Sequence, residues 1–322
     1  MTTTTPATLL LRQSEVRAVL SMEDAIEGVE GAFAAHARGE TLMPVKVHLD
    51  LRSYNGDFRA MPAYLDGATG VKWINAHPDN PAKGLPTVRG MYILSDPATA
   101  VPLAVLDATW LTAARTGAAA AVASHHLAPA NVGSIGFIGC GVQARTLLAA
   151  HRAVFDSFEV VAADARSEAA AAFAEEAGGR AGSLADASAC DIVCTATPVR
   201  EPIIRSEWLN GPRHVNAMRA DGHGKQEFAT EILGRARLVV DDYDQAIAGG
   251  EINGPIERGE FTPDTIHASL GEIIDGLRPG REGDELTIFD STGLAVQDVA
   301  IAARVYNRAR DSGIGTELDF FA

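Results

Sequence analysis

Three small residues around position 140 have the spacing that lets a polypeptide backbone approach a bound anion. Gly139, Gly141 and Ala144 form the pattern G-x-G-x-x-A. The first glycine permits a tight turn, the second admits a pyrophosphate, and the alanine allows a helix to pack closely on a strand. The N–H groups and positive dipole of the helix start favour the same anion. The pattern therefore predicts a dinucleotide site.

The residues on either side of this turn support the prediction. Residues 132–138 alternate small and apolar side chains as a buried strand does, and 143–155 repeat apolar positions at helical spacing. A second strand, 159–163, ends on Asp164, which lies 23 residues beyond Gly141. An acid near this spacing hydrogen-bonds the ribose hydroxyls of the adenosine half. The alternative is that the glycines only shape a turn and that Asp164 caps the next helix.

The acid at position 164 also bears on which cofactor binds. A carboxylate there repels a 2′-phosphate, so we expect NAD(H) rather than NADP(H). Arg166 follows closely in the chain and would offset part of that repulsion.

Lys72 lies inside an apolar strand pattern, which is an unusual place for a lysine. An ammonium group is costly to bury unless something pairs with it, and burial brings its pKa into a range useful for acid–base catalysis. The same pattern also fits a lysine at a strand edge with its amine in water. Periodicity alone leaves both interpretations open.

Arg59 and Arg115 are two further cations among apolar or small residues. Arg115 is expected to open an Ala-rich helix over 113–127, where a cation is unfavourable to the helix dipole unless an anion lies beside it. Arg59, Lys72 and Arg115 together would hold a carboxylate, because arginine binds one in bidentate geometry. Taken singly, each could instead form a surface salt bridge.

A polar cluster runs from Asn216 to Lys225, after a predicted parallel strand. Ligands bind at the carboxyl ends of such strands in open α/β sheets. Asp221, among glycines, is a candidate general acid–base group, although it could simply form an Asx turn. Ser291-Thr-Gly293 follows the last strand in the same way and is a candidate to reach the nicotinamide end of the cofactor.

Composition excludes several classes of function. The formal net charge of −15 disfavours nucleic acid and anionic membranes as partners. No apolar run approaches the roughly 20 residues that span a bilayer. The three cysteines suggest no disulfide framework, so we expect a reducing cytoplasm. Nine scattered histidines without an H-E-x-x-H motif predict no metal site.

The spacing of strands and helices predicts an α/β protein with two domains. From residue 132 the expected strands 132–138, 159–163, 191–196, 214–217, 237–241 and 286–290 alternate with helices, which is typical of a doubly wound parallel Rossmann sheet. The N-terminal part has helices at 15–20 and 22–38 and strands at 45–51, 57–63, 70–76, 87–95 and 102–106, as in an α+β domain dominated by antiparallel sheet. The last helix, 294–310, is expected to return to it. We expect a substrate-binding and dimerisation domain at 1–117 and 300–322, and an NAD-binding domain at 118–299.

Along nearly its whole length the chain resembles the ornithine cyclodeaminase/µ-crystallin family, and within it the archaeal alanine dehydrogenase branch. The segments that carry the resemblance occur in the family's order and spacing: Arg59–Pro62, Val71–Trp73, Asn80–Pro81, Gly84–Val88, Arg115–Gly117, Gly136–Gly141, Ala220–Asp221, Gly224–Lys225, Gly249–Asn253 and Asp290–Asp298.

The resemblance implies a homodimer whose N-terminal domains join sheets, and an NAD-dependent oxidoreductase that acts on the CH–NH₂ or C=N group of small L-amino acids and their 2-imino or 2-oxo acids. It implies that Lys72 is catalytic or binds substrate, that Arg59 and Arg115 hold substrate carboxylate or cofactor, and that Asp221 is the acid–base group. We expect the cofactor to contact Thr87, Arg115, Gly139, Gly141, Val142, Gln143, Asp164, Arg166, Thr197, Met218, Lys225, Ser291 and Gly293.

Arg219 departs from the family pattern, which usually has glycine there, two residues before the acid–base aspartate. A guanidinium at this position would repel the distal ammonium of ornithine and could bind a second carboxylate. A dicarboxylic imine such as iminosuccinate, which gives aspartate, therefore stands beside an alanine-type substrate. Arg219 could instead face the cofactor phosphates or solvent. Ornithine cyclodeamination and a non-catalytic, crystallin-like nucleotide binder remain the alternative functions.

Overall fold

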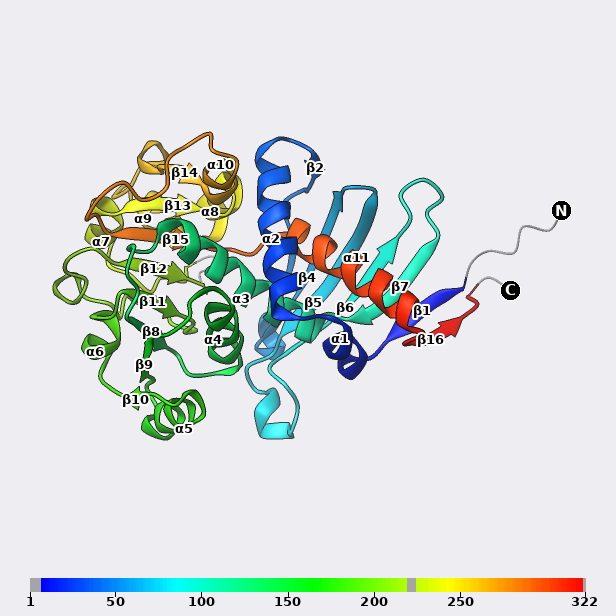
Figure 1. Cartoon of the computed structure of the whole chain (residues 1–322), viewed down its shortest axis with the longest axis horizontal. Coiled ribbons are helices and arrows are strands. Elements are labelled where there is room, and N and C mark those ends of the chain that lie inside the picture. The colour runs from blue at the N-terminus through cyan, green and yellow to red at the C-terminus, as the bar shows by residue number, and fades with distance from the viewer. Residues whose placement is uncertain (1–6, 219–223, 321–322) are drawn as a thin grey trace. The chain divides into compact units, whose positions relative to one another are not determined.

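The structure is a computed structural model that describes residues 7–218 and 224–320 (Figure 1). The chain divides into two compact units. The first contains Met1–Arg115 together with Leu294–Ala322, and the second contains Thr116–Gly293. The chain thus leaves the first unit, completes the second, and returns. The functions expected of 1–117 with 300–322 and of 118–299 stay predictions.

The second unit is built on an eight-stranded sheet in which every neighbouring pair is parallel. The strand order is β10-β9-β8-β11-β12-β15-β13-β14. This confirms the doubly wound parallel sheet. The strands are β8 (Ser134–Ile138), β9 (Glu159–Ala163), β10 (Arg180–Ala181), β11 (Ile192–Thr195), β12 (His214–Ala217), β13 (Arg237–Val240), β14 (Ala268–Ser269) and β15 (Thr287–Asp290).

Helices separate these strands along the chain, and their spacing explains why the sheet is parallel. Three central strands, β11, β12 and β15, are buried at every position, as expected when helices cover both faces. The strand order reverses between β8 and β11, because β9 follows β8 on one side and β11 begins the other. The helices are α3 (Ala108–Leu127), α4 (Val142–Val154), α5 (Ser167–Ala177), α6 (Leu184–Ser188), α7 (Thr230–Arg235), α8 (Tyr243–Gly249), α9 (Asn253–Glu257) and α10 (Leu270–Ile274).

The first unit has a mixed sheet in the order β16-β1-β7-β6-β5-β4-β2, with β3 paired to β4. Within it β1 runs parallel to β7 and the other pairs are antiparallel. The C-terminal strand β16 lies at one edge beside β1, so the end of the chain completes the N-terminal sheet. The strands are β1 (Thr8–Leu11), β2 (Thr41–Leu42), β3 (Val47–Leu51), β4 (Gly56–Leu65), β5 (Ala68–Ala76), β6 (Val88–Ser95), β7 (Pro102–Asp107) and β16 (Thr316–Leu318).

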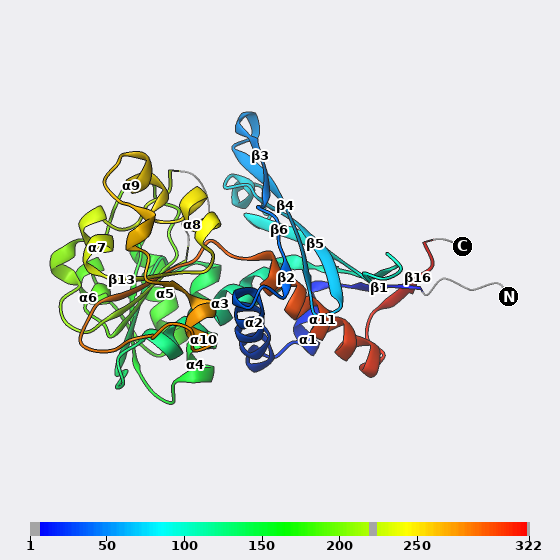
Figure 2. The same ribbon diagram turned by 90° about the horizontal axis from the view of Figure 1, so that it is seen from above.

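One face of this sheet is covered by helices. The helix α11 (Ala295–Ser312) packs against β4, β5 and β6, α2 (Met22–Ala37) packs against α11, and α1 (Gln13–Val19) contacts α11 as well (Figure 2). Paired residues of neighbouring strands form one row under α11: Met61, Lys72, Tyr92 and Leu106, each at most 4% exposed. A lysine therefore sits in the middle of an otherwise apolar row.

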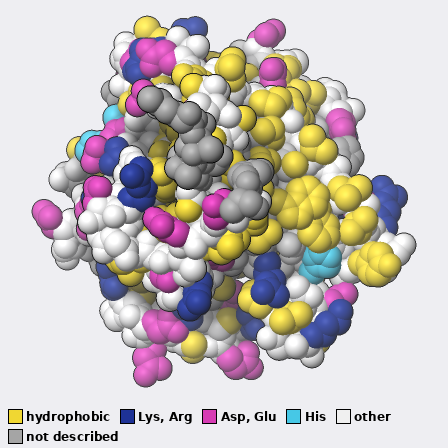
Figure 3. Space-filling model, turned by 90° about the vertical axis from the view of Figure 1, so that its right-hand side faces the viewer, with side chains coloured by type: hydrophobic (Ala, Val, Ile, Leu, Met, Phe, Trp, Pro, Cys, Tyr) yellow, Lys and Arg dark blue, Asp and Glu magenta, His cyan; other side chains and the backbone are white. Residues whose placement is uncertain are grey.

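The opposite face of the same sheet carries exposed hydrophobic side chains. Trp73 pairs with Met91, and these two are 42% and 56% exposed. Val47 and Ile93 are 64% and 40% exposed on the same face. The ring of Trp73 stacks on that of Phe58, with centroids 5.1 Å apart. A space-filling view shows hydrophobic side chains gathered on one side of the molecule (Figure 3).

Candidate active site

Lys72 is the most unusual residue of the first unit, because its side chain is completely buried. It lies on β5, between β4 and β6, and its Nζ is 2.7 Å from Oδ2 of Asp298. Asp298 is also fully buried, and it comes from the first turn of α11. The structure thus excludes a lysine at a strand edge with its amine in water and shows a buried ion pair.

The surroundings of Lys72 bring its pKa close to neutrality. The pKa of Lys72 is lowered from 10.5 to about 7, because burial and the positive charge of Arg115 lower it more than Asp298 raises it. Burial also raises the pKa of Tyr92, the direct cross-strand neighbour of Lys72, well above its usual value. Tyr92 therefore stays neutral, and Lys72 is the group in this row that can exchange a proton near pH 7.

Arg115 lies against the same carboxylate. Its Nε is 3.6 Å from Oδ1 of Asp298, and its Nη1 donates a hydrogen bond of 3.3 Å to Oε1 of Gln297. Its helix begins at Ala108, so Arg115 is not in the first turn and the dipole argument for an adjacent anion was misplaced. The anion is there nevertheless, because Asp298 supplies it.

Arg59 lies on the same face of the sheet as Lys72. In the pairing of β4 with β5, Met61 is opposite Lys72 and Arg59 is opposite Ile74. Arg59 lies two residues from Met61 on β4, and side chains two residues apart on a strand point to the same face. Its Nη2 is 2.6 Å from Oδ2 of Asp57, and Arg59 is 14% exposed. The same oxygen of Asp57 is 3.2 Å from Nε2 of His48. The three predicted cations therefore share one unit and one side of its sheet.

Asp221 and Arg219 lie outside the described residues, so their predicted roles stay predictions. The residues before and after them are described. Met218 is buried, and its N–H donates a hydrogen bond of 3.1 Å to the carbonyl of Thr195. Lys225 is half-buried.

The predicted dinucleotide turn has the expected geometry in the second unit. Gly139 has φ of +93°, a conformation that favours glycine, and a Cβ there would lie 2.7 Å from the carbonyl oxygen of Ala196. Gly141 precedes the first residue of α4, and no atom lies within 4 Å of where its Cβ would be. Val142 is 71% exposed at the helix start. The space before the N-terminus of α4 is thus open to a pyrophosphate, and Gln143 follows in the first turn.

Asp164 has a structural role at this turn. Its Oδ2 accepts a hydrogen bond of 2.8 Å from the N–H of Cys140, and its Oδ1 accepts one of 2.9 Å from the N–H of Arg166. Arg166 precedes α5 and its side chain is 76% exposed, with Nε 3.8 Å from Asp164. Asp164 therefore joins the end of β9 to the glycine turn, which is where an acid that meets the adenosine ribose must lie.

Two buried carboxylates hold other residues predicted to contact the cofactor. Glu227 accepts hydrogen bonds from the N–H and hydroxyl of Thr197, at 3.0 and 2.5 Å. Asp241 accepts hydrogen bonds from the N–H groups of Thr292 and Gly293, both at 2.7 Å, and one of 3.4 Å from the hydroxyl of Ser291. Both carboxylates are 1% exposed.

Thr87, the remaining residue of the predicted cofactor set, lies just before β6 in the first unit. Its carbonyl accepts a hydrogen bond of 2.8 Å from the N–H of His77.

Sequence reasoning missed Asp298, Glu227 and Asp241. For Asp298 there was a signal, because it shares a helix face with Ala295, Val299 and Ala302, at the spacing of buried positions. A carboxylate on an apolar stripe predicts a buried cation as its partner, and Lys72 was a candidate because it lies in an apolar strand pattern. Glu227 gave no such signal, since its partners are backbone and hydroxyl groups that any segment carries.

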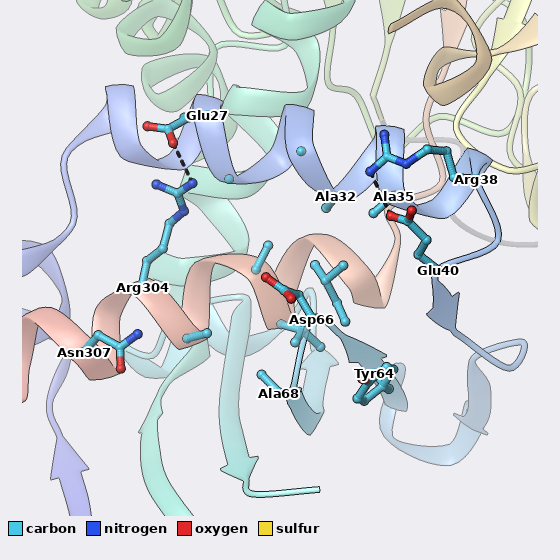
Figure 4. Close-up of a pocket in the computed structure, with 16 residues that line it drawn as sticks. Glu27, Ala32, Ala35, Arg38, Glu40, Tyr64, Asp66, Ala68, Arg304 and Asn307 are labelled. Carbon is cyan, nitrogen blue, oxygen red and sulfur yellow. Dashed lines mark hydrogen bonds and ion pairs between the residues drawn. The ribbon is translucent and has the colours of Figure 1, made fainter. Parts of the chain in front are cut away.

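A separate pocket of about 680 Å³ lies between α2, α11 and the β4–β5 hairpin (Figure 4). Four of its five charged side chains form two ion pairs: Arg304 with Glu27 at 2.9 Å and Arg38 with Glu40 at 2.8 Å. None of the residues predicted to bind substrate or cofactor lines it. It is not the site formed around Lys72.

Comparison with known proteins identifies the family. Residues 7–313 match the model of the ornithine cyclodeaminase/mu-crystallin family. The chain belongs to this family. Among family members, the alanine dehydrogenase of Archaeoglobus fulgidus is 49% identical over 98% of this chain and 99% of its own length. The relationship therefore includes both units and every segment described above.

Solved structures of the family have the same fold. An archaeal alanine dehydrogenase dimer with bound NAD superposes with a TM-score of 0.93 at 49% identity, covering 98% of this chain and 99% of that one. The Δ¹-pyrroline-2-carboxylate reductase of Thermococcus litoralis, in complex with NADH and L-proline, gives 0.92 at 34% identity over 97% and 100%. The iminosuccinate reductase of Paracoccus denitrificans with NAD⁺ gives 0.90 at 28% identity over 98% and 100%.

Proposed function

We propose that this protein is an NADH-dependent imine reductase or amino-acid dehydrogenase that interconverts a small 2-imino or 2-oxo acid and its L-amino acid. The buried Lys72–Asp298 pair carries the proposal, because a lysine with a pKa near 7 can give or take a proton at physiological pH. The relatives support it: an alanine dehydrogenase, a pyrroline-carboxylate reductase and an iminosuccinate reductase, all with nicotinamide cofactors in their structures.

The residues of the second unit fit a dinucleotide. The open space at Gly141 and the N-terminus of α4 suit a pyrophosphate, and Asp164 at the end of β9 suits the adenosine ribose. The bound nicotinamide supplies or accepts the hydride at the α-carbon. We assign the remaining cofactor contacts to the turns at Thr197 and at Ser291–Gly293, and to Met218 and Lys225.

The chain's own groups bind the substrate and move its proton. Arg59 and Arg115 hold the α-carboxylate, which fixes the orientation of the α-carbon. Lys72 donates a proton to the substrate nitrogen during reduction and removes one during oxidation. Asp298 holds the amine of Lys72 in place, and Asp221 shares the proton transfer.

The charges around Lys72 favour a substrate with one carboxylate. Asp57 and Asp298 are two anions beside the three cations Arg59, Lys72 and Arg115, so one positive charge is left when Lys72 is protonated. One α-carboxylate balances it. A dicarboxylic substrate needs one more cation, and Arg219 is the residue that would supply it. We therefore propose an alanine-type substrate first and iminosuccinate second.

The test is a spectrophotometric assay of NADH oxidation with ammonia and pyruvate, glyoxylate or oxaloacetate, and with cyclic imines. We expect turnover with pyruvate and a higher kcat/KM with NADH than with NADPH. If Arg219 faces the substrate, Arg219→Gly removes about tenfold or more of the activity on the dicarboxylic imine and spares the three-carbon substrate. No oxidation with any of these compounds would contradict the proposal. Efficient cyclodeamination of ornithine by the wild type would contradict the charge argument.

We also propose that two copies of the chain associate through the exposed face of the first unit's sheet. Exposed hydrophobic side chains form a contiguous group there, and surfaces of this kind mark protein–protein contacts. The archaeal alanine dehydrogenase is a dimer. The three cysteines are free and buried, which supports the proposal that the protein works in the reducing cytoplasm.

A further inference from the structure

Glu227 makes an unusual set of contacts at the end of β11. Its Oε1 accepts hydrogen bonds from the N–H and the hydroxyl of Thr197, and its Oε2 accepts one of 2.7 Å from the hydroxyl of Thr195. Thr195 is the last residue of β11, and Thr197 is the second residue of the loop that follows. One buried carboxylate thus fixes both sides of the point where this strand ends.

The loop that Glu227 holds is packed against the dinucleotide turn. A Cβ on Gly139 would lie 2.7 Å from the carbonyl oxygen of Ala196 and 3.0 Å from Cγ2 of Thr197. Gly139 follows β8, and residues 196–197 follow β11, so this contact spans the place where the strand order reverses. Ligands of doubly wound sheets bind in the crevice at this place. The position of Thr197 therefore sets one wall of that crevice.

Glu227 is itself held firmly. Its N–H donates to both carboxylate oxygens of Glu251 at 3.0 Å, and the N–H of Phe228 donates to one of them at 3.2 Å. Its carbonyl accepts hydrogen bonds from Ile203 and Ile204, at 3.0 and 3.1 Å. Burial and the charges of Glu227 and Asp290 raise the pKa of Glu251 well above its usual value.

We propose that Glu227 is a positioning residue for the cofactor: through Thr197 it fixes the wall of the crevice opposite Gly139. The inference rests on the proposed binding of a dinucleotide in the second unit. Without the carboxylate, the N–H and hydroxyl of Thr197 lose their acceptor, and residues 196–197 are free to shift against the glycine turn. NADH then binds to a crevice that is no longer preorganised.

The experiment compares Glu227→Gln with a control substitution of another carboxylate that contacts the ends of β8 and β11. Asp191 precedes β11 and accepts three hydrogen bonds, from the N–H groups of Gly133 and Ser134 and the hydroxyl of Ser134, at 2.9, 2.9 and 3.0 Å. Asp191 lies at the N-terminal end of β11, whereas the crevice lies at the C-terminal ends of β8 and β11. Asp191→Asn therefore controls for the loss of a carboxylate that ties β8 to β11.

We expect Glu227→Gln to weaken NADH binding to the full-length protein by about tenfold, measured by fluorescence titration. Both carboxylate oxygens of Glu227 accept hydrogen bonds, and glutamine replaces one of these acceptors with an NH2 donor. The KM for NADH should rise by a similar factor while kcat at saturating NADH changes little. Asp191→Asn should lower the melting temperature and leave the NADH Kd within twofold. NADH binding by Glu227→Gln within twofold of wild type would overturn the inference, as would an equal loss in Asp191→Asn.

A second pair of variants applies if Glu227→Gln does not fold. Thr197→Val removes the hydroxyl that Glu227 holds, and Thr197→Ser keeps it. We expect NADH to bind several-fold more weakly to the valine variant and normally to the serine variant. Equal binding by both would overturn the inference. A wild-type protein that binds no NADH would instead contradict the proposed function, so the two failures are distinguishable.

Discussion

At the scale of single residues, we expect the ion pair between Lys72 and Asp298 to set the pH dependence of the proposed reaction. Asp298 raises the pKa of Lys72, and burial and Arg115 lower it, with a balance at about 7. In the proposed mechanism, reduction of an imine needs Lys72 protonated, so kcat/KM for reduction should fall as pH rises through about 7. Oxidation of the amino acid needs Lys72 neutral and should rise over the same range.

Asp298→Asn tests this assignment. Removing the anion that favours the protonated lysine lowers the pKa of Lys72, so both pH profiles should move toward acid, by about one unit or more. The measurement is kcat/KM against pH in both directions. An exposed acid of the same unit, Asp50, pairs with Arg52 at the surface, and Asp50→Asn should leave the profiles in place. Profiles that do not move in Asp298→Asn would show that Lys72 is not the titrating group.

At the scale of elements, two glycines of the second unit serve different purposes. A Cβ on Gly117 of α3 would lie 2.7 Å from the carbonyl carbon of Thr146 in α4, so this glycine lets the two helices touch. A Cβ on Gly141 would meet nothing within 4 Å. Gly117→Ala should therefore destabilise the unit by about 1–3 kcal/mol, and the melting temperature should fall by several degrees. Gly141→Ala should melt as wild type does and bind NADH more weakly, because its methyl group enters the space for the pyrophosphate.

The melting temperature and the NADH Kd are measured for both Gly117→Ala and Gly141→Ala and compared with those of the wild type. A loss of stability in Gly141→Ala would contradict the open space at the helix start. Unchanged stability in Gly117→Ala would show that α3 and α4 can separate at little cost.

The elements themselves were predictable to different degrees. Every central strand of the parallel sheet was expected within two residues of its observed bounds, because strands buried on both faces are continuous apolar runs. β1 and β16 were not expected. They pair Thr8–Leu10 with Thr316–Leu318, and no local pattern indicates a partner so distant in the chain. The two-residue strands β10 and β14 are too short to show a period at all.

A site residue was predictable where its type differed from that of the residues around it in the sequence. Lys72 did so in an apolar strand, and the glycines did so between a strand and a helix. Asp298 and Glu227 are defined by what they contact in three dimensions, and those contacts join residues 226 and 30 positions apart (298 minus 72, and 227 minus 197). The spacing of residues within one helix or strand does not predict contacts between residues so far apart in the chain.

At the scale of the whole molecule, the exposed sheet face should control assembly. Trp73 lies at the centre of this face, between Ala60 and Met91 in the pairing of β4, β5 and β6. Trp73→Glu places a charge where an apolar contact with a second copy is proposed, and charges are depleted from the cores of such interfaces. We expect the variant to be a monomer of 33.8 kDa by size-exclusion chromatography with light scattering, and the wild type to have twice that mass.

Leu277 provides the control, because it is 61% exposed in the second unit. Leu277→Glu should leave the mass of the wild type unchanged. A dimer that survives in Trp73→Glu would place the contact between copies elsewhere.

The return of the chain to its first unit also sets an order of events during synthesis. The ribosome makes β5, with Lys72, long before it makes α11, and the whole second unit, Thr116–Gly293, is translated between them. The second unit holds all the strands of its own sheet and can fold as soon as it has emerged. The first unit must wait, with the sheet face that α11 will cover still exposed to water. Lys72 keeps the pKa of a solvated amine through this interval, and it becomes a group that titrates near neutrality only when residue 298 arrives.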